Sequence, residues 1–276
     1  MPKLEKVKSL TDKLLPMFIA LSFIMAFVIG ILWEKVSSLE KGGGGSTTPS
    51  TSTDNTQQAQ PQAQAGQVAV TQDQIKKLFS QDLIKFGDDK KKVLFVAVED
   101  PSCPYCHIAS GLNPELNNQS GDRFKLVSEG GTYVAPVPEM EKLVNQGKAS
   151  LVYIYTPGHG NGEMGMKALY CAFDEGKFWQ AHNLLFTSAG YDLLNNKVKN
   201  DKTKSGDIAE FLKSAVDQNK LKSCLDSGKY DDRLSSDTTL AASIGVKGTP
   251  GFYVNTTNFA GAYSWKDMES AVTSAL

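Results

Sequence analysis

Hydrophobic and polar positions divide this chain into three parts. The first contains an apolar run of twenty residues, Leu14–Trp33, without a charged side chain. The second is polar, and residues 42–67 contain no large apolar side chain. From Thr71 onward, apolar positions recur with spacings that are typical of strands and helices. The pattern therefore predicts an apolar anchor, a linker and one folded domain.

The apolar run is long enough to cross a membrane, because twenty helical residues extend about 30 Å, the thickness of the hydrocarbon core. Pro16 would lie in the first turn, where a missing N–H is tolerated, and Trp33 at an interface. A cleavable signal peptide has a shorter apolar stretch, and no small-residue cleavage site follows here. A soluble helix would have a polar face. We therefore expect residues 14–36 to be a retained transmembrane anchor.

Charges on either side of the anchor set its expected orientation. Four lysines precede it and only two follow it closely: Lys3, Lys6, Lys8 and Lys13, then Lys35 and Lys41. By the positive-inside rule, residues 1–13 form a cytoplasmic tail and everything after the anchor is exported. Residues 37–70, rich in Gly, Ser, Thr, Gln and Pro, form a flexible linker. We expect a single-pass protein of the cell membrane with an extracytoplasmic domain.

The domain from residue 71 to 276 reads as an α/β fold. Thr71 and Gln74 form a capping box before an apolar helix face. Val93–Val98 is an apolar run suited to a strand buried on both faces, and residues 151–155 and 252–254 predict two further strands. The stretch from about 157 to 243 is helical in pattern, and a last helix begins near Ser264. This order predicts a sheet with a helical insertion.

Composition excludes some functions. A net charge of −1, without a cluster of Lys and Arg, gives no basis for binding nucleic acid. Four cysteines and three histidines supply a metal site poorly, so we expect no metal and no cofactor.

The motif Cys103-Pro104-Tyr105-Cys106 is the strongest candidate for chemistry. It follows a turn at the end of a predicted strand and opens a helix. Cys103 would lie where free N–H groups and the helix dipole favour a thiolate, and Pro104 suits the first helical position. Cys106 lies nearly one turn later on the same face. Cys103 is therefore the expected nucleophile and Cys106 the resolving thiol. Half of a zinc site and a static disulfide are the alternatives.

The chain from Thr71 resembles the DsbA-like branch of the thioredoxin superfamily. The resemblance lies in five segments, which are Asp100–Cys106, Ala168–Ala172, Gly176–Phe186, Cys224–Tyr230 and Gly245–Phe252. It implies a thioredoxin fold with an inserted helical domain. It also implies that Pro250 is cis and lies beside the cysteines, and that Thr249 offers backbone hydrogen bonds to an extended substrate.

This resemblance implies thiol–disulfide exchange with exported proteins that contain cysteine pairs. We expect a thiol oxidase that is re-oxidised by a membrane partner, either DsbB-like or similar to vitamin K epoxide reductase. A reductase or isomerase is the alternative with the same chemistry, because the Pro-Tyr dipeptide does not decide the direction. A tethered binding or chaperone module without turnover is the alternative from another class.

Two residues are candidate modulators of Cys103. Many relatives carry a buried acid six positions before the first cysteine, where this chain has Ala97. Glu99 could replace that acid, but Glu99 and Asp100 lie near the strand end and are expected to be solvated. His107 would raise the reactivity of Cys103 if charged and close; otherwise it is a helix-surface side chain.

The remaining cysteines and histidines are expected to be structural. An exported domain favours a disulfide between Cys171, on an insertion helix, and Cys224, near the start of another. Two buried free thiols or a second redox relay are the alternatives. His159 lies in a Gly-rich loop, interpreted as a flexible surface loop rather than a border of the substrate cleft. His182 is interpreted as a core residue.

Overall fold

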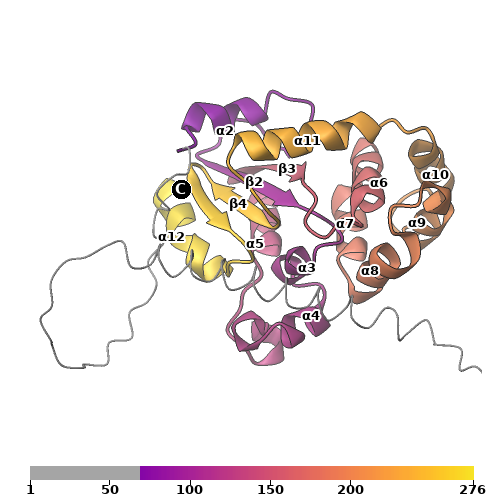
Figure 1. The fold of residues 1–276 in the computed structure, drawn as a ribbon. Helices are drawn as coiled ribbons and strands as arrows, with labels where there is room; N and C mark the ends of the chain where they lie inside the picture. The colour runs from indigo at the N-terminus through magenta and orange to yellow at the C-terminus, as the bar shows by residue number, and fades with distance from the viewer. Residues whose placement is uncertain (1–68) are drawn as a thin grey trace, which may run out of the picture. The chain divides into compact units, whose positions relative to one another are not determined.

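A computed structural model of the chain describes residues 69–276 (Figure 1). Its centre is a five-stranded sheet in the order β1-β3-β2-β4-β5. The strands are β1 Ile84–Phe86, β2 Val93–Glu99, β3 Ala149–Tyr155, β4 Gly251–Val254 and β5 Thr257–Ala260. β2 and β3 pair in parallel, and the other neighbouring strands pair antiparallel.

Helices cover both faces of the sheet (Figure 1). Those of the basic fold are α2 Gln72–Leu78, α3 Pro104–Ser110, α4 Pro114–Gln119, α5 Pro136–Asn145 and α12 Trp265–Ala275. Six more lie between β3 and β4: α6 Glu163–Asp174, α7 Phe178–Leu185, α8 Ser188–Asp192, α9 Ser205–Phe211, α10 Gln218–Asp226 and α11 Asp231–Ser243. This arrangement confirms the α/β fold with a helical insertion.

The central strands are apolar because both of their faces are buried. Every residue of β2 and of β3 is buried. One face of β2 packs against α2 and α11, and the other packs against α3, α5, α12 and the insertion helices. Ala97 and Tyr153 belong to the second face, in the same cluster as Cys103 and Cys106. The redox motif is thus built onto the most buried part of the sheet.

The insertion contains a disulfide between Cys171 of α6 and Cys224 of α10. Cys224 lies in the last turn of α10, not near the start of a helix as the sequence suggested. Tyr170, next to Cys171, donates a hydrogen bond of 2.5 Å to the buried carboxylate of Asp237 in α11. Arg233 pairs with the same carboxylate at 2.9 Å. These contacts tie three insertion helices together.

Several boundaries differ from the sequence prediction. The helix that the motif opens stops at Ser110, because Gly111 adopts a φ of +67°, and α4 starts anew at Pro114. The short edge strands β1 and β5 and the helix α5 were not predicted. Val70, assigned to the end of the linker, is buried against α2 and the sheet.

Within residues 69–276, none of the helices combines the length and the apolar composition that a bilayer crossing requires. The predicted tail (1–13), the anchor (14–36) and nearly all of the linker (37–70) lie outside the described residues.

Candidate active site around Cys103 and Cys106

The motif is held at the junction between β2 and α3. Cys103 is the N-cap residue of α3, with extended backbone, and Pro104 occupies the first helical position. The N–H of Cys103 donates to the Asp100 carbonyl at 2.9 Å, which closes the turn after β2. The N–H of Cys106 donates back to the Cys103 carbonyl at 3.1 Å. The Cys103 thiol therefore lies at the N-terminal end of the helix, where partial positive charge favours a thiolate.

A cis-proline lies opposite the cysteines. The Thr249–Pro250 peptide bond is cis and leads directly into β4, which pairs with β2. The Sγ atom of Cys103 lies 3.5 Å from the Thr249 carbonyl oxygen. Two segments almost 150 residues apart thus meet at one sulfur. A substrate backbone that pairs with Thr249 would reach Cys103 directly.

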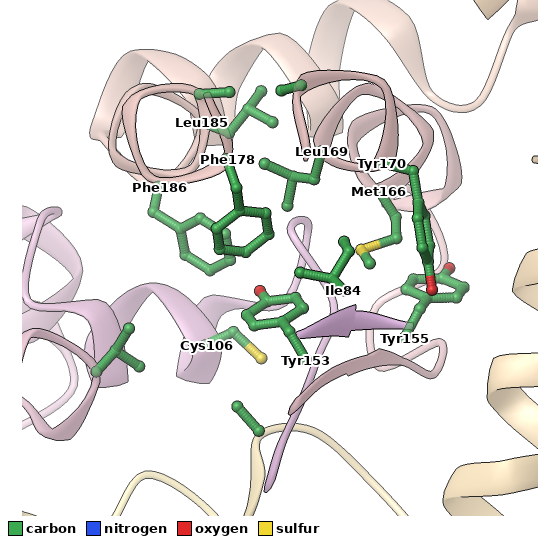
Figure 2. Close-up of a cluster of buried hydrophobic side chains, with 14 of the residues drawn as sticks. Ile84, Cys106, Tyr153, Tyr155, Met166, Leu169, Tyr170, Phe178, Leu185 and Phe186 are labelled. Atoms are coloured by element: carbon green, nitrogen blue, oxygen red, sulfur yellow. The ribbon is translucent and has the colours of Figure 1, made fainter. Parts of the chain in front are cut away.

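The two thiols have different surroundings. Cys103 is 4% exposed and Cys106 is fully buried. A hydrogen bond from Cys106, helped by backbone N–H groups of the helix start, lowers the pKa of Cys103 to about 7. Burial raises the pKa of Cys106, and the charge on Cys103 raises it further. Cys106 projects its sulfur toward Tyr153 inside the core (Figure 2). This asymmetry fits Cys103 as the attacking thiolate and Cys106 as the resolving thiol.

The prediction that Glu99 is solvated is wrong. It is the last residue of β2 and is fully buried, on the face of the sheet that also carries Ala97 and Tyr153. Its Oε2 atom accepts a hydrogen bond of 3.2 Å from the Tyr153 hydroxyl. Burial raises the pKa of Glu99 to about 8, and the charge on Cys103 adds to this rise. Ala97 and Glu99 lie on the same face of β2, two positions apart.

His107 is also not a surface residue. The ring is fully buried, with Nδ1 2.9 Å from the Phe186 carbonyl and Nε2 2.8 Å from the Pro101 carbonyl. Burial lowers the pKa of His107 to about 4, so the ring is neutral at pH 7 and donates to one carbonyl. It joins α3 to the end of α7. A charged His107 that activates Cys103 is therefore not supported.

Asp100 is the residue that sequence reasoning missed. It was expected to be solvated, but it is fully buried. Its Oδ1 accepts hydrogen bonds from the N–H and the hydroxyl of Ser102 at 2.8 and 2.7 Å. Its Oδ2 accepts from the N–H groups of Gly158 and His159 at 2.7 and 2.9 Å. An Asp before Pro-Ser was a signal for such a turn, because aspartate commonly accepts from the N–H two residues on.

The loop that carries His159 borders the site. A Cβ atom added to Gly158 would lie 1.7 Å from the Thr249 Oγ1 atom and 3.4 Å from the Cys103 Cβ atom. Residues 157–160 are exposed, as expected of a surface loop, but the loop also borders the site, which the sequence interpretation had disfavoured. His182 is a buried core residue that stacks on Phe186 at 4.1 Å between ring centroids.

The site brings together all the motif residues predicted from the sequence. Cys103, Pro104 and Tyr105 line the start of α3, while Thr249 and Pro250 face them from the edge of β4. Cys171 and Cys224 are bonded within the insertion. Among residues 69–276, no group of three His, Cys, Asp or Glu side chains is arranged to hold a metal ion.

A helix that begins with two cysteines, a cis-proline opposite them and a helical insertion define a thiol–disulfide oxidoreductase with the DsbA-type fold. The chain belongs to the thioredoxin family, whose model matches residues 137–274. This match includes the cis-proline and α12 but begins after Cys106.

Solved structures with the same fold include proteins from Bacillus subtilis, Wolbachia pipientis and Chlamydia trachomatis. Oxidised BdbD from Bacillus subtilis has a TM-score of 0.51 and 17% identity, over 70% of this chain and 92% of that chain. A cysteine variant of Wolbachia pipientis alpha-DsbA1 has a TM-score of 0.53 and 16% identity, over 75% and 96%. Chlamydia trachomatis DsbA has a TM-score of 0.50 and 17% identity, over 71% and 91%. No curated protein sequence matches the chain.

Proposed function

We propose that this protein oxidises cysteine pairs of exported proteins by donating the disulfide of Cys103 and Cys106. The observation that carries the proposal is the asymmetry of the two thiols beside cis-Pro250. The pKa of Cys103 is lowered to about 7, whereas burial raises that of Cys106. A stabilised Cys103 thiolate favours the reduced form of the site and so makes the disulfide a better oxidant.

The exchange takes place in two steps. A substrate thiolate attacks the Sγ atom of Cys103, the Cys103–Cys106 bond breaks, and Cys106 leaves as a thiolate that takes up a proton. The second substrate thiolate then attacks the substrate sulfur of the mixed disulfide, and Cys103 leaves as a thiolate. Two electrons pass from the substrate dithiol to the protein. One of the two substrate protons remains on Cys106, and the other is released or held by Cys103.

We infer that Glu99 holds the proton that Cys106 gains and loses. Burial raises the pKa of Glu99 to about 8, which is close to the working pH, as proton transfer requires. The charge of Glu99 in turn raises the pKa of Cys106, so the two groups affect each other's protonation. Tyr153 donates its hydroxyl hydrogen bond to Glu99, and its ring lies beside Cys106 (Figure 2).

The proposed location and partners depend on the sequence before the domain. A retained anchor at residues 14–36 would hold the domain outside the cytoplasm, where disulfides persist. The linker would let Cys103 meet both soluble substrates and a membrane partner that re-oxidises it. A DsbB-like protein or one similar to vitamin K epoxide reductase would accept the two electrons.

A reductase is the second candidate, because the asymmetry of the two thiols permits exchange in either direction and the Cys103 pKa of about 7 is lowered only moderately. A value near 7 is typical of thioredoxin, whereas the strong oxidant DsbA has a pKa of roughly 3.5. The reduction potential of the Cys103–Cys106 couple, measured in glutathione buffers, separates the candidates. A potential near −120 mV supports the oxidase, and one near roughly −270 mV supports the reductase.

Two variants test the chemistry itself. Cys106→Ser should accumulate mixed disulfides between Cys103 and exported proteins, and Cys103→Ser should form none. If neither variant forms them and the parent exchanges no thiols, the chain is a binding module instead. Labelling of cysteines added at residues 5 and 60 in intact cells tests the orientation of the anchor.

A further inference from the structure

One turn of the insertion contacts the segment that presents Cys103. Between α8 and α9 the chain forms a π-helix, Leu193–Val198, which is followed by two residues with left-handed backbone. Lys199 has a φ of +47° and Asn200 a φ of +62°. π-helices are rare and often lie at functional sites, and left-handed residues other than glycine are uncommon. The side chains of this turn explain why such a backbone is kept.

Asn195 of this turn reaches the residue before the nucleophile. It is 8% exposed, and its Nδ2 atom donates a hydrogen bond of 3.1 Å to the Ser102 carbonyl oxygen. The same NH₂ group donates at 3.2 Å to the Tyr191 carbonyl oxygen one turn earlier. Its Oδ1 atom accepts at 3.2 Å from the Asn161 amide in the loop after β3. Both donor hydrogens and the acceptor are thus used, which fixes the orientation of the Asn195 amide.

A second amide of the same turn holds the loop after β3. Asn200 donates from Nδ2 to the Gly160 carbonyl at 2.8 Å and accepts on Oδ1 from the Met164 N–H at 3.3 Å. Asparagine adopts the left-handed backbone more readily than most residues, which explains its place here. The π-helical turn therefore fixes the loop that borders Cys103, as well as the residue before Cys103.

The Ser102 carbonyl depends on the Asn195 contact. Ser102 is fully buried, and no backbone N–H within residues 69–276 bonds its carbonyl oxygen. Buried carbonyl groups are almost always hydrogen-bonded, so this one would take another donor if the Asn195 amide were removed. The N–H of Cys106 lies four residues on, which is the usual spacing between the donor and the acceptor in an α-helix. The Cys106 N–H is therefore the donor that the freed carbonyl would attract.

That N–H group contributes to the state of Cys103. The pKa of Cys103 is lowered to about 7, chiefly by the Cys106 thiol and further by the backbone N–H groups of Cys106 and Tyr105. If the Ser102 carbonyl took the Cys106 N–H, the helix would gain a turn at its start and this N–H would point away from the Cys103 sulfur. Asn195 occupies the carbonyl and so leaves the N–H groups at the helix start free for the thiolate.

We propose that Asn195 is a positioning residue for thiol–disulfide exchange, because its amide binds the Ser102 carbonyl and thereby keeps the start of α3 directed at the Cys103 sulfur. It is not a catalytic residue, since its hydrogen bonds go to carbonyl and amide groups rather than to sulfur. Asn161 supports it by fixing the direction of its amide. The inference rests on the proposed exchange at Cys103 and adds to the site a residue from the helical insertion.

Removal of the amide tests the proposal. Asn195→Leu nearly retains the side-chain volume but has no donor. The pH midpoint for alkylation of Cys103 by iodoacetamide, measured on the reduced full chain, should rise by about 0.5–1 unit, because the thiolate loses hydrogen bonding. Asn196→Leu is the matched control, since it changes the next residue of the same turn, which is exposed and bonds Asp192 at 2.9 Å. Its midpoint should stay near that of the parent.

A second variant and a second measurement separate positioning from folding. Asn161→Ala removes the partner that orients the Asn195 amide, and it should raise the midpoint by a smaller amount. A higher Cys103 pKa also shifts the redox equilibrium, because a less stable thiolate makes the reduced form less favourable. In glutathione buffers at pH 8.5, Asn195→Leu should favour the disulfide about three- to eight-fold more than the parent does. A merely structural role would leave both values unchanged in the folded variants.

The possible outcomes distinguish this inference from the proposed function. Urea unfolding shows whether each variant is folded. An unchanged midpoint in folded Asn195→Leu, or an equal rise in Asn196→Leu, would overturn the role of Asn195. If Asn195→Leu does not fold, Asn161→Ala decides, and an unchanged midpoint there overturns the inference. A parent protein that exchanges no disulfide with glutathione would instead contradict the proposed function, while its alkylation midpoint still tests Asn195.

Discussion

The carboxylate of Asp100 and the backbone N–H of Gly158 form a hydrogen bond of 2.7 Å that joins the end of β2 to the loop after β3. The same side chain accepts from the N–H of Ser102 at 2.8 Å. One buried carboxylate thus holds both the turn that presents Cys103 and the loop that packs against Thr249. Asp100 is a positioning residue, since it contacts neither sulfur with its side chain.

We expect Asp100→Asn to destabilise the domain by about 2–4 kcal/mol, because hydrogen bonds to a charged acceptor are strong and the amide NH₂ would face the Gly158 and His159 donors. Urea unfolding of the oxidised protein measures this loss. Asp89→Asn, which changes an exposed turn acid, is the matched control. Equal stability of the two variants would contradict the role of Asp100.

Gly158→Ala should slow exchange at Cys103 and destabilise the domain by about 1–3 kcal/mol, because overpacking forces neighbours to move. The added methyl group would lie 1.7 Å from the Thr249 Oγ1 atom. Gly206→Ala in α9 has nothing closer than 3.8 Å and should stabilise its helix by about 0.5–1 kcal/mol. Thermal unfolding and the rate of reaction with dithiothreitol compare the two. A slowed reaction in both variants would mean that the Thr249 contact is not specific.

The rate of alkylation of Cys103 by iodoacetamide should rise with a midpoint near pH 7, since only the thiolate reacts and the pKa of Cys103 is lowered to about 7. Cys106→Ala removes the largest cause of that shift. Its midpoint should move up toward the ordinary value of 9.0. Mass spectrometry of the reduced protein follows the reaction. An unchanged midpoint in Cys106→Ala would assign the shift to the helix start alone.

The parent protein should become less stable as the pH rises, and Glu99→Gln should abolish this pH dependence. Burial raises the folded pKa of Glu99 to about 8, above the unfolded value, so the folded state binds more protons between them. The folded state is most stable below the unfolded pKa, where Glu99 is protonated in both states, and it loses this stability as the pH rises through 8. Between pH 5 and 8 the parent should lose on the order of 4 kcal/mol relative to Glu99→Gln.

Urea unfolding of the oxidised proteins at several pH values measures this difference, because the disulfide removes the titration of both thiols. Glu129→Gln, an exposed glutamate, controls for the loss of one carboxyl group. A constant difference between parent and Glu99→Gln from pH 5 to 8 would show that the buried acid does not titrate in this range.

The sequence predicted the features that depend only on neighbouring residues, namely one central strand, two helix caps and the start of α3. The apolar run at Val93–Val98 became β2, and Thr71 and Ser264 cap their helices with capping boxes. The position of Cys103 at the start of α3 followed from the turn and Pro104. Each of these features depends on residues within about one helical turn of one another.

The errors concern contacts between distant segments. Glu99, Asp100 and His107 were expected near solvent because their neighbours in sequence are polar or end a strand. Asp100 binds the N–H groups of Gly158 and His159, and His107 meets the Phe186 carbonyl 79 residues away. Glu99 is buried beside Tyr153 of the neighbouring strand. No periodicity in the sequence specifies which loop covers a strand end. Burial, and with it the raised pKa of Glu99, therefore required the tertiary structure.

Replacement of Cys171 and Cys224 by alanine should cost about 4 kcal/mol, because the bridge closes a loop that otherwise adds to the entropy of the unfolded chain. The two residues are 53 positions apart and join α6 to α10. Urea unfolding of the fully oxidised parent and variant, without reductant, measures the loss. The alkylation midpoint of Cys103 should stay near pH 7, since neither cysteine of the bridge contributes to its pKa. A shifted midpoint would instead support coupling between the bridge and the redox site, as a relay requires.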